Sequence, residues 1–284
     1  MRDFPSCFGE NGVQVADASS NSSKTSQNLV NCLYSAELSG RSCVISITWS
    51  RNMMGQGLNI GVDDSKNKSL CRVDIKPWLF SKRRGSKTTD AGNSKVDVFW
   101  DLTNAKFGSG PEPLEGFFVA VLFDLQIVLL LGDLVKEAHR RTNATPPASN
   151  ALLLAKREHI FGKKVYSTKA QLRDRGRVHE IMIQSETAGS SDPCLEIRID
   201  KKRVMQVKHL LWKFRGNQTI LVDGLPVEVF WDVHNWLFDA STGNAVFMFQ
   251  SSASTEKTMP SQGLRESELR PVGFSLILYA WKND

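Results

Sequence analysis

The sequence predicts an almost entirely β-stranded protein made of two tandem copies of one β-domain. Short apolar runs alternate with a period of two residues, as strands with one buried face do, and Gly, Asn, Asp and Ser separate these runs. A tryptophan-containing segment also occurs twice at a long spacing, which indicates duplicated domains rather than a solenoid. We expect mainly antiparallel β-barrels or β-sandwiches joined by a short helical linker. The pattern does not separate barrels from sandwiches.

Length and composition agree with this prediction. A chain of 284 residues can form two ordinary domains, each with its own core. With 23% charged and 41% hydrophobic residues, the composition is that of a typical globular protein. The first segment, residues 1–28, is predicted to be flexible, because residues 16–28 consist largely of small polar side chains with almost nothing to bury.

The first β-domain is predicted over residues 29–135, where residues 44–49 and 96–100 alternate clearly. One stretch, Phe117–Leu134, is apolar enough to resemble a membrane span, but Asp124 lies near its middle, and a charge there is costly in a bilayer. We therefore expect a hairpin instead, and no transmembrane segment. Its two strands are predicted as Phe117–Phe123 and Ile127–Leu131, joined by Asp124, Leu125 and Gln126.

A basic, partly helical linker is predicted over residues 136–159, before the second β-domain at 160–284. Residues 132–141 have helical character, and residues 145–147, Thr-Pro-Pro, are typical of a linker. For residues 151–155, helix and strand both stay open. In the second domain, Asp223 and Gly224 are a type I′ turn signal between two strand-like runs, which predicts a hairpin.

The internal repeat is the strongest feature of the sequence. Val96–Phe107 matches Val227–Phe238 at seven of twelve positions, with an offset of 131 residues. Weaker matches extend upstream with an offset that drifts by a few residues, as loop insertions produce. The matched pairs that we single out are Trp100 with Trp231, Asp101 with Asp232, and Asn104 with Asn235.

These pairs have a functional and a structural interpretation. The tryptophans could line an aromatic ligand pocket, and the aspartates could act as paired catalytic acids. A residue present in both copies is more simply explained by the fold, however. We expect the tryptophans to pack in the cores and each aspartate to accept backbone N–H groups in an Asx turn at the end of a strand.

No motif for catalysis, a cofactor or a metal is present. No histidine has a second ligand at helical spacing, and Gly162, Lys163 and Lys164 lack the upstream glycine of a phosphate loop. His234, just after a strand, is expected to be a turn residue with local hydrogen bonds rather than a catalytic base. We therefore expect a protein that is not an enzyme, with no catalytic residue, no cofactor and no metal site.

The cysteines and the beginning of the chain predict an intracellular protein. The five cysteines are odd in number, none is in a C-x-x-C spacing, and no apolar run follows Met1. We expect five free thiols and a cytoplasmic location; a nuclear location is also compatible.

One charged segment stands out from the rest. Residues 136–177 contain eleven Lys or Arg and three Asp or Glu, a net charge of +8 in a chain whose total is +6. A solvated face is the simple interpretation. The alternative is weak, salt-sensitive binding to anionic surfaces. That contact is assigned to Arg140, Arg141, Lys156 and Arg157. With only two aromatic residues in the segment, sequence-specific nucleic-acid recognition is not expected.

Several segments resemble a known plant family. They are Trp212–Ile220, Val222–Phe238, Arg157–Gly162, Leu129–Asp133 and Leu278–Asn283. On these residues the chain is similar to the plant family catalogued as domain of unknown function 868, over nearly its whole length. The resemblance implies a land-plant source and no activity, so it transfers no functional residue.

Three functions remain open from the sequence. The first is a non-enzymatic binding or scaffold protein with a protein partner, whose two domains dock through their hydrophobic faces. The second is a β-barrel carrier of a small apolar ligand. The third is a peripheral protein that associates with anionic surfaces.

Overall fold

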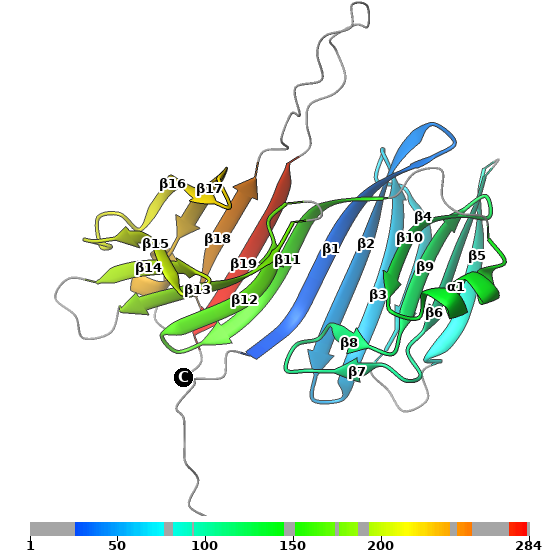
Figure 1. Cartoon of the computed structure of the whole chain (residues 1–284), viewed down its shortest axis with the longest axis horizontal. Helices are drawn as coiled ribbons and strands as arrows, with labels where there is room; N and C mark the ends of the chain where they lie inside the picture. The colour runs from blue at the N-terminus through cyan, green and yellow to red at the C-terminus, as the bar shows by residue number, and fades with distance from the viewer. Residues whose placement is uncertain are drawn as a thin grey trace, which may run out of the picture.

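The protein is an elongated, mostly β-stranded molecule (Figure 1). The computed structural model describes residues 26–76, 82–92, 94–144, 151–173, 176–186, 193–238, 243–251 and 273–282. Nearly all strand pairs are antiparallel, so the predicted all-β, mainly antiparallel class is confirmed. The predicted flexible segment 1–28 lies outside the described residues as far as residue 25, and residues 26–28 already belong to the first strand.

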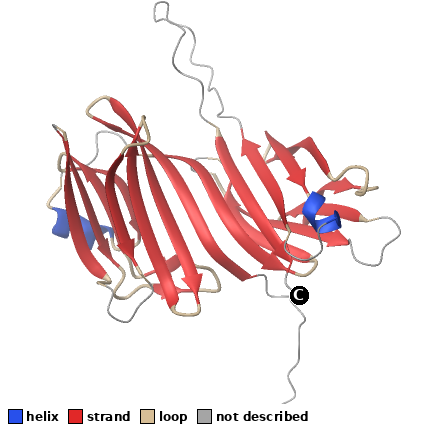
Figure 2. Ribbon diagram, turned by 180° about the vertical axis from the view of Figure 1, so that it is seen from behind, coloured by secondary structure: helices blue, strands red, loops and turns tan. Residues whose placement is uncertain are grey.

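A single nine-stranded sheet runs the length of the molecule (Figure 2). In spatial order its strands are β16 (Arg215–Val222), β17 (Leu225–Asp232), β18 (Asn244–Ser251), β19 (Phe274–Lys282), β11 (Leu152–Gly162), β1 (Ser26–Leu38), β2 (Arg41–Asn52), β3 (Gly55–Asp64) and β4 (Ser69–Ile75). The central strand β11 pairs with β1 in antiparallel fashion and with β19 in parallel. The two halves of the chain are therefore joined by backbone hydrogen bonds.

Two smaller sheets cover one face of this large sheet, one at each end (Figure 1). One contains β10 (Gln126–Gly132), β9 (Phe118–Phe123), β6 (Ser94–Asp101) and β5 (Arg84–Ala91); the other contains β12 (Val165–Gln171), β13 (Val178–Glu186), β14 (Cys194–Ile199) and β15 (Lys202–Val207). A two-stranded ribbon, β7 (Lys106–Phe107) and β8 (Pro113–Glu115), lies beside the first, and the short helices are α1 (Val135–Thr142) and α2 (His234–Phe238).

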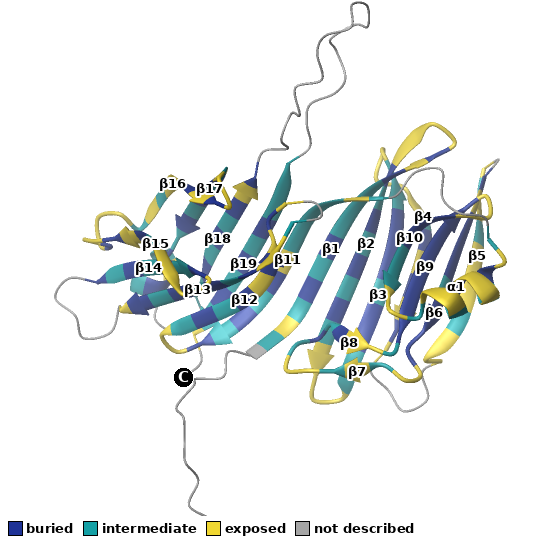
Figure 3. Cartoon of the chain, in the orientation of Figure 1, coloured by how far each residue is buried: buried dark blue, intermediate teal, exposed yellow. Residues whose placement is uncertain are grey.

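Each end of the molecule is a two-layer sandwich with its own core. The first core packs β1–β4 against β6 and β9, with Ile45, Ile60 and Val98 fully buried. The second packs β12–β15 against β16–β19, with Ile197 and Phe247 fully buried. Period-two burial along the strands is visible in Figure 3. The described sheets are open and none closes into a barrel, so the barrel alternative is wrong. Two facing open sheets already bury the apolar side of each strand.

The apolar stretch after residue 117 forms the predicted hairpin. Strands β9 and β10 are joined by Asp124 and Leu125, which both have positive φ, as a two-residue hairpin turn requires. The sequence of β9 is a continuous apolar run because this strand is buried on both faces. Among the described residues, no helix is both long and apolar enough to cross a membrane.

The segment predicted as a linker, residues 136–159, divides into two parts. Its first part is helix α1, which ends at Asn143 in a left-handed conformation. The Thr-Pro-Pro sequence lies outside the described residues. From Leu152 the chain forms β11, so the open question about residues 151–155 is answered as strand from Leu152 onward. The strands that pair with β11 are remote in sequence, so the local sequence pattern does not distinguish helix from strand at residues 151–155.

The described cysteines agree with the thiol prediction. Cys32, Cys43, Cys71 and Cys194 are not in disulfide bonds. Cys7 lies outside the described residues.

The repeated segment forms similar hairpins in the two halves. Arg84 faces Asp101 in β5–β6, and Arg215 faces Asp232 in β16–β17. In each hairpin a glycine lies directly under a tryptophan: a Cβ atom added to Gly85 would be 2.6 Å from Trp100, and one added to Gly216 would also be under 3.0 Å from Trp231. The duplication itself stays a prediction.

We predict that Gly85→Ala and Gly216→Ala destabilise the protein by similar amounts. Each new methyl group would displace an indole ring from a packed core, which costs about 1–3 kcal/mol. Thermal and urea unfolding should show the loss. Thr219→Ala, at an exposed position of β16, is the control and should change stability little. A parent-like melting curve for either glycine variant would mean that its tryptophan is not held in place.

Candidate functional site

The repeated tryptophans occupy equivalent structural positions. The indole N–H of Trp100 donates to the carbonyl of Lys82 at 3.0 Å, and that of Trp231 donates to the carbonyl of Lys213 at 2.9 Å. Both side chains are buried in the two cores. They pack the sandwiches rather than line an open pocket.

The repeated aspartates lie at strand ends. Asp101 accepts a hydrogen bond from the backbone N–H of Thr103 at 3.0 Å, and Asp232 accepts one from the N–H of His234 at 3.1 Å. This is the geometry that the Asx-turn interpretation expects. The two surroundings differ, because the Asp101 side chain is 11% exposed and that of Asp232 is 42% exposed.

The repeated asparagines are not equivalent. Asn104 is exposed in the turn before β7, and its side chain makes no hydrogen bond to the other described residues. Asn235 lies in α2, with its Oδ1 atom 3.3 Å from Nδ1 of His234. His234 is thus a turn residue with local contacts, and its ring packs against Phe238.

The four cations assigned to an anionic surface do not form one patch. Arg140 pairs with Glu137 at 2.6 Å. Arg141 donates to the carbonyl of Trp100, lies 3.6 Å from Asp101 and stacks over the ring of Phe118. Both side chains therefore belong to the contacts of helix α1 with the first sandwich.

Lys156 and Arg157 point to opposite faces of β11, as neighbours in a strand must. Lys156 faces inward and its side chain is only 16% exposed, whereas Arg157 is exposed and forms no ion pair with the described residues. Of the four predicted contacts, Arg157 alone is an unengaged cation. The prediction of anionic-surface binding stays untested.

A buried polar cluster occupies the middle of the large sheet, between the two cores. Nζ of Lys156 lies 2.9 Å from Glu158 and 2.9 Å from Glu112, and Thr168 donates to the fully buried carboxylate of Glu158. Burial alone would lower the pKa of Lys156, but the two carboxylates raise it above its ordinary value. Sequence analysis did not identify this cluster, because its members come from three separate segments.

The thiol and phenol groups beside this cluster have low reactivity. Burial, with a contribution from Glu112, raises the pKa of the Cys32 thiol to about 12, and burial raises the pKa of Tyr34 in the same way. A neutral, buried thiol is a poor nucleophile. The cluster is therefore a set of paired charges at the junction of the two halves.

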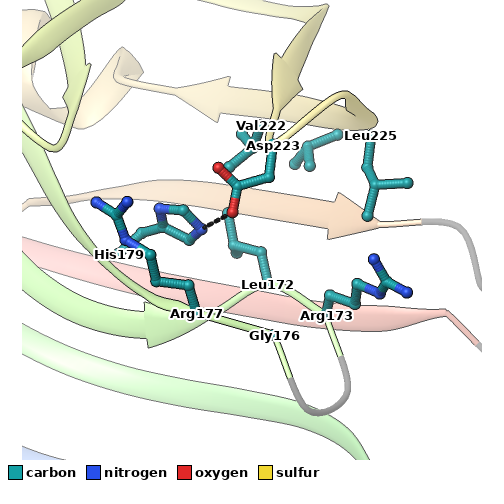
Figure 4. A pocket seen from close by; sticks show the side chains of 9 residues that line it. Leu172, Arg173, Gly176, Arg177, His179, Val222, Asp223 and Leu225 are labelled. Carbon is teal, nitrogen blue, oxygen red and sulfur yellow. Dashed lines mark ion pairs between the residues drawn. The ribbon is translucent and has the colours of Figure 1, made fainter.

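The candidate site is a pocket at the end of the second sandwich (Figure 4). The buried ring of His179, in β13, lies between two carboxylates: Nδ1 is 2.9 Å from Asp200 and Nε2 is 3.1 Å from Asp223. Asp200 is in the β14–β15 turn and Asp223 in the β16–β17 turn, so His179 connects the small sheet to the large one. Both contacts are satisfied only when both ring nitrogens carry protons.

The pocket has a volume of about 170 Å³ and combines charged and apolar walls. It is lined by Leu172, Arg173, Gly176, Arg177, His179, Val222, Asp223, Leu225 and Val227. Arg177 pairs with Asp200 at 2.7 Å, whereas Arg173 is exposed and forms no ion pair with the described residues. Hydrogen bonds from His179 and from the backbone of Glu180, together with Arg177, lower the pKa of Asp200.

Sequence analysis missed this site. The turn at Asp223 and Gly224 was identified from its residues, but nothing in the sequence brings it to His179, which lies 44 positions earlier. Among the described residues, no group of three or more His, Cys, Asp or Glu side chains could hold a metal ion.

We predict that Asp101→Ala destabilises the protein more than Asp232→Ala does. The buried carboxylate of Asp101 holds a backbone N–H and two arginines, and its loss should cost about 1–3 kcal/mol. Asp232 is more exposed and solvent-screened, so about 0.5–1 kcal/mol is expected. Urea denaturation measures both, with the asparagine variants as controls that keep one acceptor oxygen. The reverse order would contradict this account.

We also predict that Lys156→Met is strongly destabilising. It leaves Glu158 fully buried without its cation, and breaking a buried pair in this way costs about 3 kcal/mol or more. Adding Glu158→Gln should restore part of the loss, because the uncompensated charge is then gone. Chemical denaturation of the single and double variants is the measurement, and a single-variant loss below about 1 kcal/mol would count against a buried ion pair.

Comparison with known proteins gives one match. A family model described as "Plant protein of unknown function (DUF868)" matches residues 25–282. Neither the curated proteins nor the solved structures contain a match. Because the family model spans nearly the whole of the described chain, the protein belongs to this plant family of unknown function, DUF868.

Proposed function

We propose that the protein is a non-enzymatic binding protein that holds a small organic anion in the His179 pocket. The observation that carries this proposal is a pocket in which cationic groups and an apolar wall meet. The binding site is therefore an open pocket between two sheets and not the interior of a β-barrel.

The size of the pocket limits the ligand. A cavity of about 150 Å³ accepts a molecule the size of benzene, and this pocket measures about 170 Å³. Leu172, Val222 and Val227 offer a buried apolar wall for such a body. The ligand class is therefore a single ring or short branched chain with one acidic group.

The guanidinium of Arg173 favours an anion. Arg173 and Arg177 line the pocket, while the carboxylates of Asp200 and Asp223 both contact the ring of His179. Arg177 is already engaged by Asp200, which leaves Arg173 at the rim to meet the ligand. A planar guanidinium suits a carboxylate, which it can bind through two hydrogen bonds.

The surroundings of the titratable groups support a binding role over catalysis. Both ring nitrogens of His179 face carboxylates, so neither is left to exchange a proton with a substrate. Cys32 is buried with a raised pKa. We therefore propose that the protein has no enzymatic activity.

We also propose that the two halves derive from one duplicated β-unit. Each matched tryptophan covers a matched glycine in its own hairpin: Trp100 covers Gly85, and Trp231 covers Gly216. The indole N–H of each tryptophan donates to a backbone carbonyl 18 residues earlier. In both halves a four-stranded meander precedes these hairpins: β1–β4 in the first and β12–β15 in the second. The halves differ in which of their sheets joins the nine-stranded sheet.

We predict that benzoate binds to the full-length protein and that toluene and inorganic phosphate bind much more weakly. Benzoate fits both the apolar wall and Arg173, whereas each control probe fits only one of them. Isothermal titration calorimetry should detect benzoate, and Arg173→Ala should weaken its binding by about tenfold, as loss of a charge-assisted hydrogen bond does. Lys169→Ala, an exposed cation outside the pocket, is the matched control.

Equal affinity for benzoate and toluene, or no effect of Arg173→Ala, would overturn the proposed anion site.

A further inference from the structure

The nine-stranded sheet has a second face that no described element covers. Both smaller sheets lie on one side of it, and Figure 2 shows the opposite side open. We call this opposite side the outer face. An antiparallel sheet with one face in water normally alternates between apolar inward and polar outward residues. On strands β2 and β3, Ser46, Thr48, Ser50 and Asn59 lie on the outer face, as that rule expects.

Strands β18 and β19 break the rule. Met248, Ile277 and Tyr279 point outward, while Phe247 and Leu278, their chain neighbours, are fully buried in the inner core. Around these residues the two strands are therefore apolar on both faces, which is the pattern of strands that are buried on both sides.

The outward side chains of these strands form one continuous group. Cross-strand pairs connect Phe230 to Met248, Met248 to Ile277, and Tyr279 to His159. The rings of Phe161 and Trp281 stack at 6.5 Å, and His159 lies 5.2 Å from Tyr279. We call this group the aromatic patch; it consists of Phe230, Val246, Met248, Ile277, Tyr279, Trp281, His159 and Phe161, all half-buried.

The composition of the patch is that of the core of a protein–protein interface. Aromatic residues, Met and Arg are enriched there, and Lys, Glu and Asp are depleted. The outward positions of β18, β19 and β11 hold a single charged residue, Arg157, besides His159. Polar side chains lie beside it: Asn244 and Gln250 at the ends of β18, Glu228 on β17, and Asn31 on β1, where Leu29 and Leu33 also point outward.

We propose that the aromatic patch is the interface of a homodimer, in which the outer faces of two copies of this chain pack against each other. A two-fold axis brings the same patch from both copies together, so the apolar patch of one copy covers the apolar patch of the other. Two sheets can pack face to face at about 10 Å with their strands about 30° apart.

The size and charge of the patch fit this partner. Together with its rim, the patch extends over four strands spaced by about 4.8 Å; with about 25 Å of length from each strand, this surface offers roughly 500 Å² per copy. The total of about 1,000 Å² is the lower limit for a specific interface, so the dimer should dissociate in the micromolar range. Arg157 lies at the β11 border of the patch, so an axis near β18 and β19 keeps the two arginines apart.

The test is sedimentation equilibrium of the full-length protein from about 1 to about 100 µM, which spans the expected dissociation constant. We expect a monomer–dimer equilibrium. The double variant Met248→Lys and Ile277→Lys should be monomeric throughout, because it would bring four cations together in the interface. The matched control, Ser42→Lys and Ser50→Lys, adds the same charge to the polar half of the outer face and should still dimerise.

Folding of the variants is checked by circular dichroism and thermal unfolding at low concentration. Both substituted side chains point away from the core, so we expect near-parent curves. If the lysine pair does not fold, Met248→Gln with Ile277→Thr tests the same face without charge and should weaken the dimer at least tenfold. A wild-type protein that stays monomeric at 100 µM, because another part of the chain or another protein covers the patch, overturns the proposal. Dimerisation unaffected by either patch variant overturns it too.

Discussion

The pairing of strand β11 on both of its edges is the interaction on which the rest of the structure depends. Without β11 the nine-stranded sheet would be two separate four-stranded sheets, β16–β19 and β1–β4. Its contact with β1 is antiparallel and its contact with β19 is parallel. A parallel pair needs a crossover connection, and here the whole of β12 to β18 provides it. The last described strand of the chain therefore completes the centre of the molecule.

This central position explains the polar cluster. Where the inner face of β11 lies between the two cores, it carries the charged residues Lys156 and Glu158. A buried ion pair gives little net stability compared with an apolar contact, but it is costly to break. At a junction, such a pair favours the one arrangement that keeps both charges satisfied. It also keeps the two hydrophobic cores separate.

The pocket and the aromatic patch both arise from the layered arrangement. The pocket forms where turns of the small and large sheets approach each other, with His179 held by one aspartate from each. The patch exists because both small sheets cover the same side of the large sheet and leave the other side open. A binding function at one and self-association at the other need no shared residue, so each can be tested without disturbing the other.

What the sequence determined by itself is the local structure. Period-two alternation predicted the strands, Asp124 and the residues after it predicted a hairpin instead of a membrane span, and Asp223–Gly224 predicted the β16–β17 turn. The repeated segment predicted strands at Trp100 and Trp231, and each of these residues lies in a β-hairpin. These features depend on residues within about a dozen positions of one another, where side-chain pattern and turn geometry act directly.

Only the tertiary structure decided which strands became neighbours. The alternation along β11 and β19 is the same whether the halves form two domains or share one sheet, because backbone hydrogen bonding between strands does not depend on side-chain identity. Lys156 and Arg157 looked like one basic surface in the sequence and point to opposite faces. His179 had no partner in its own segment and gained two from turns that folding brought to it. Such contacts form between residues far apart in the chain, so no local pattern contains them.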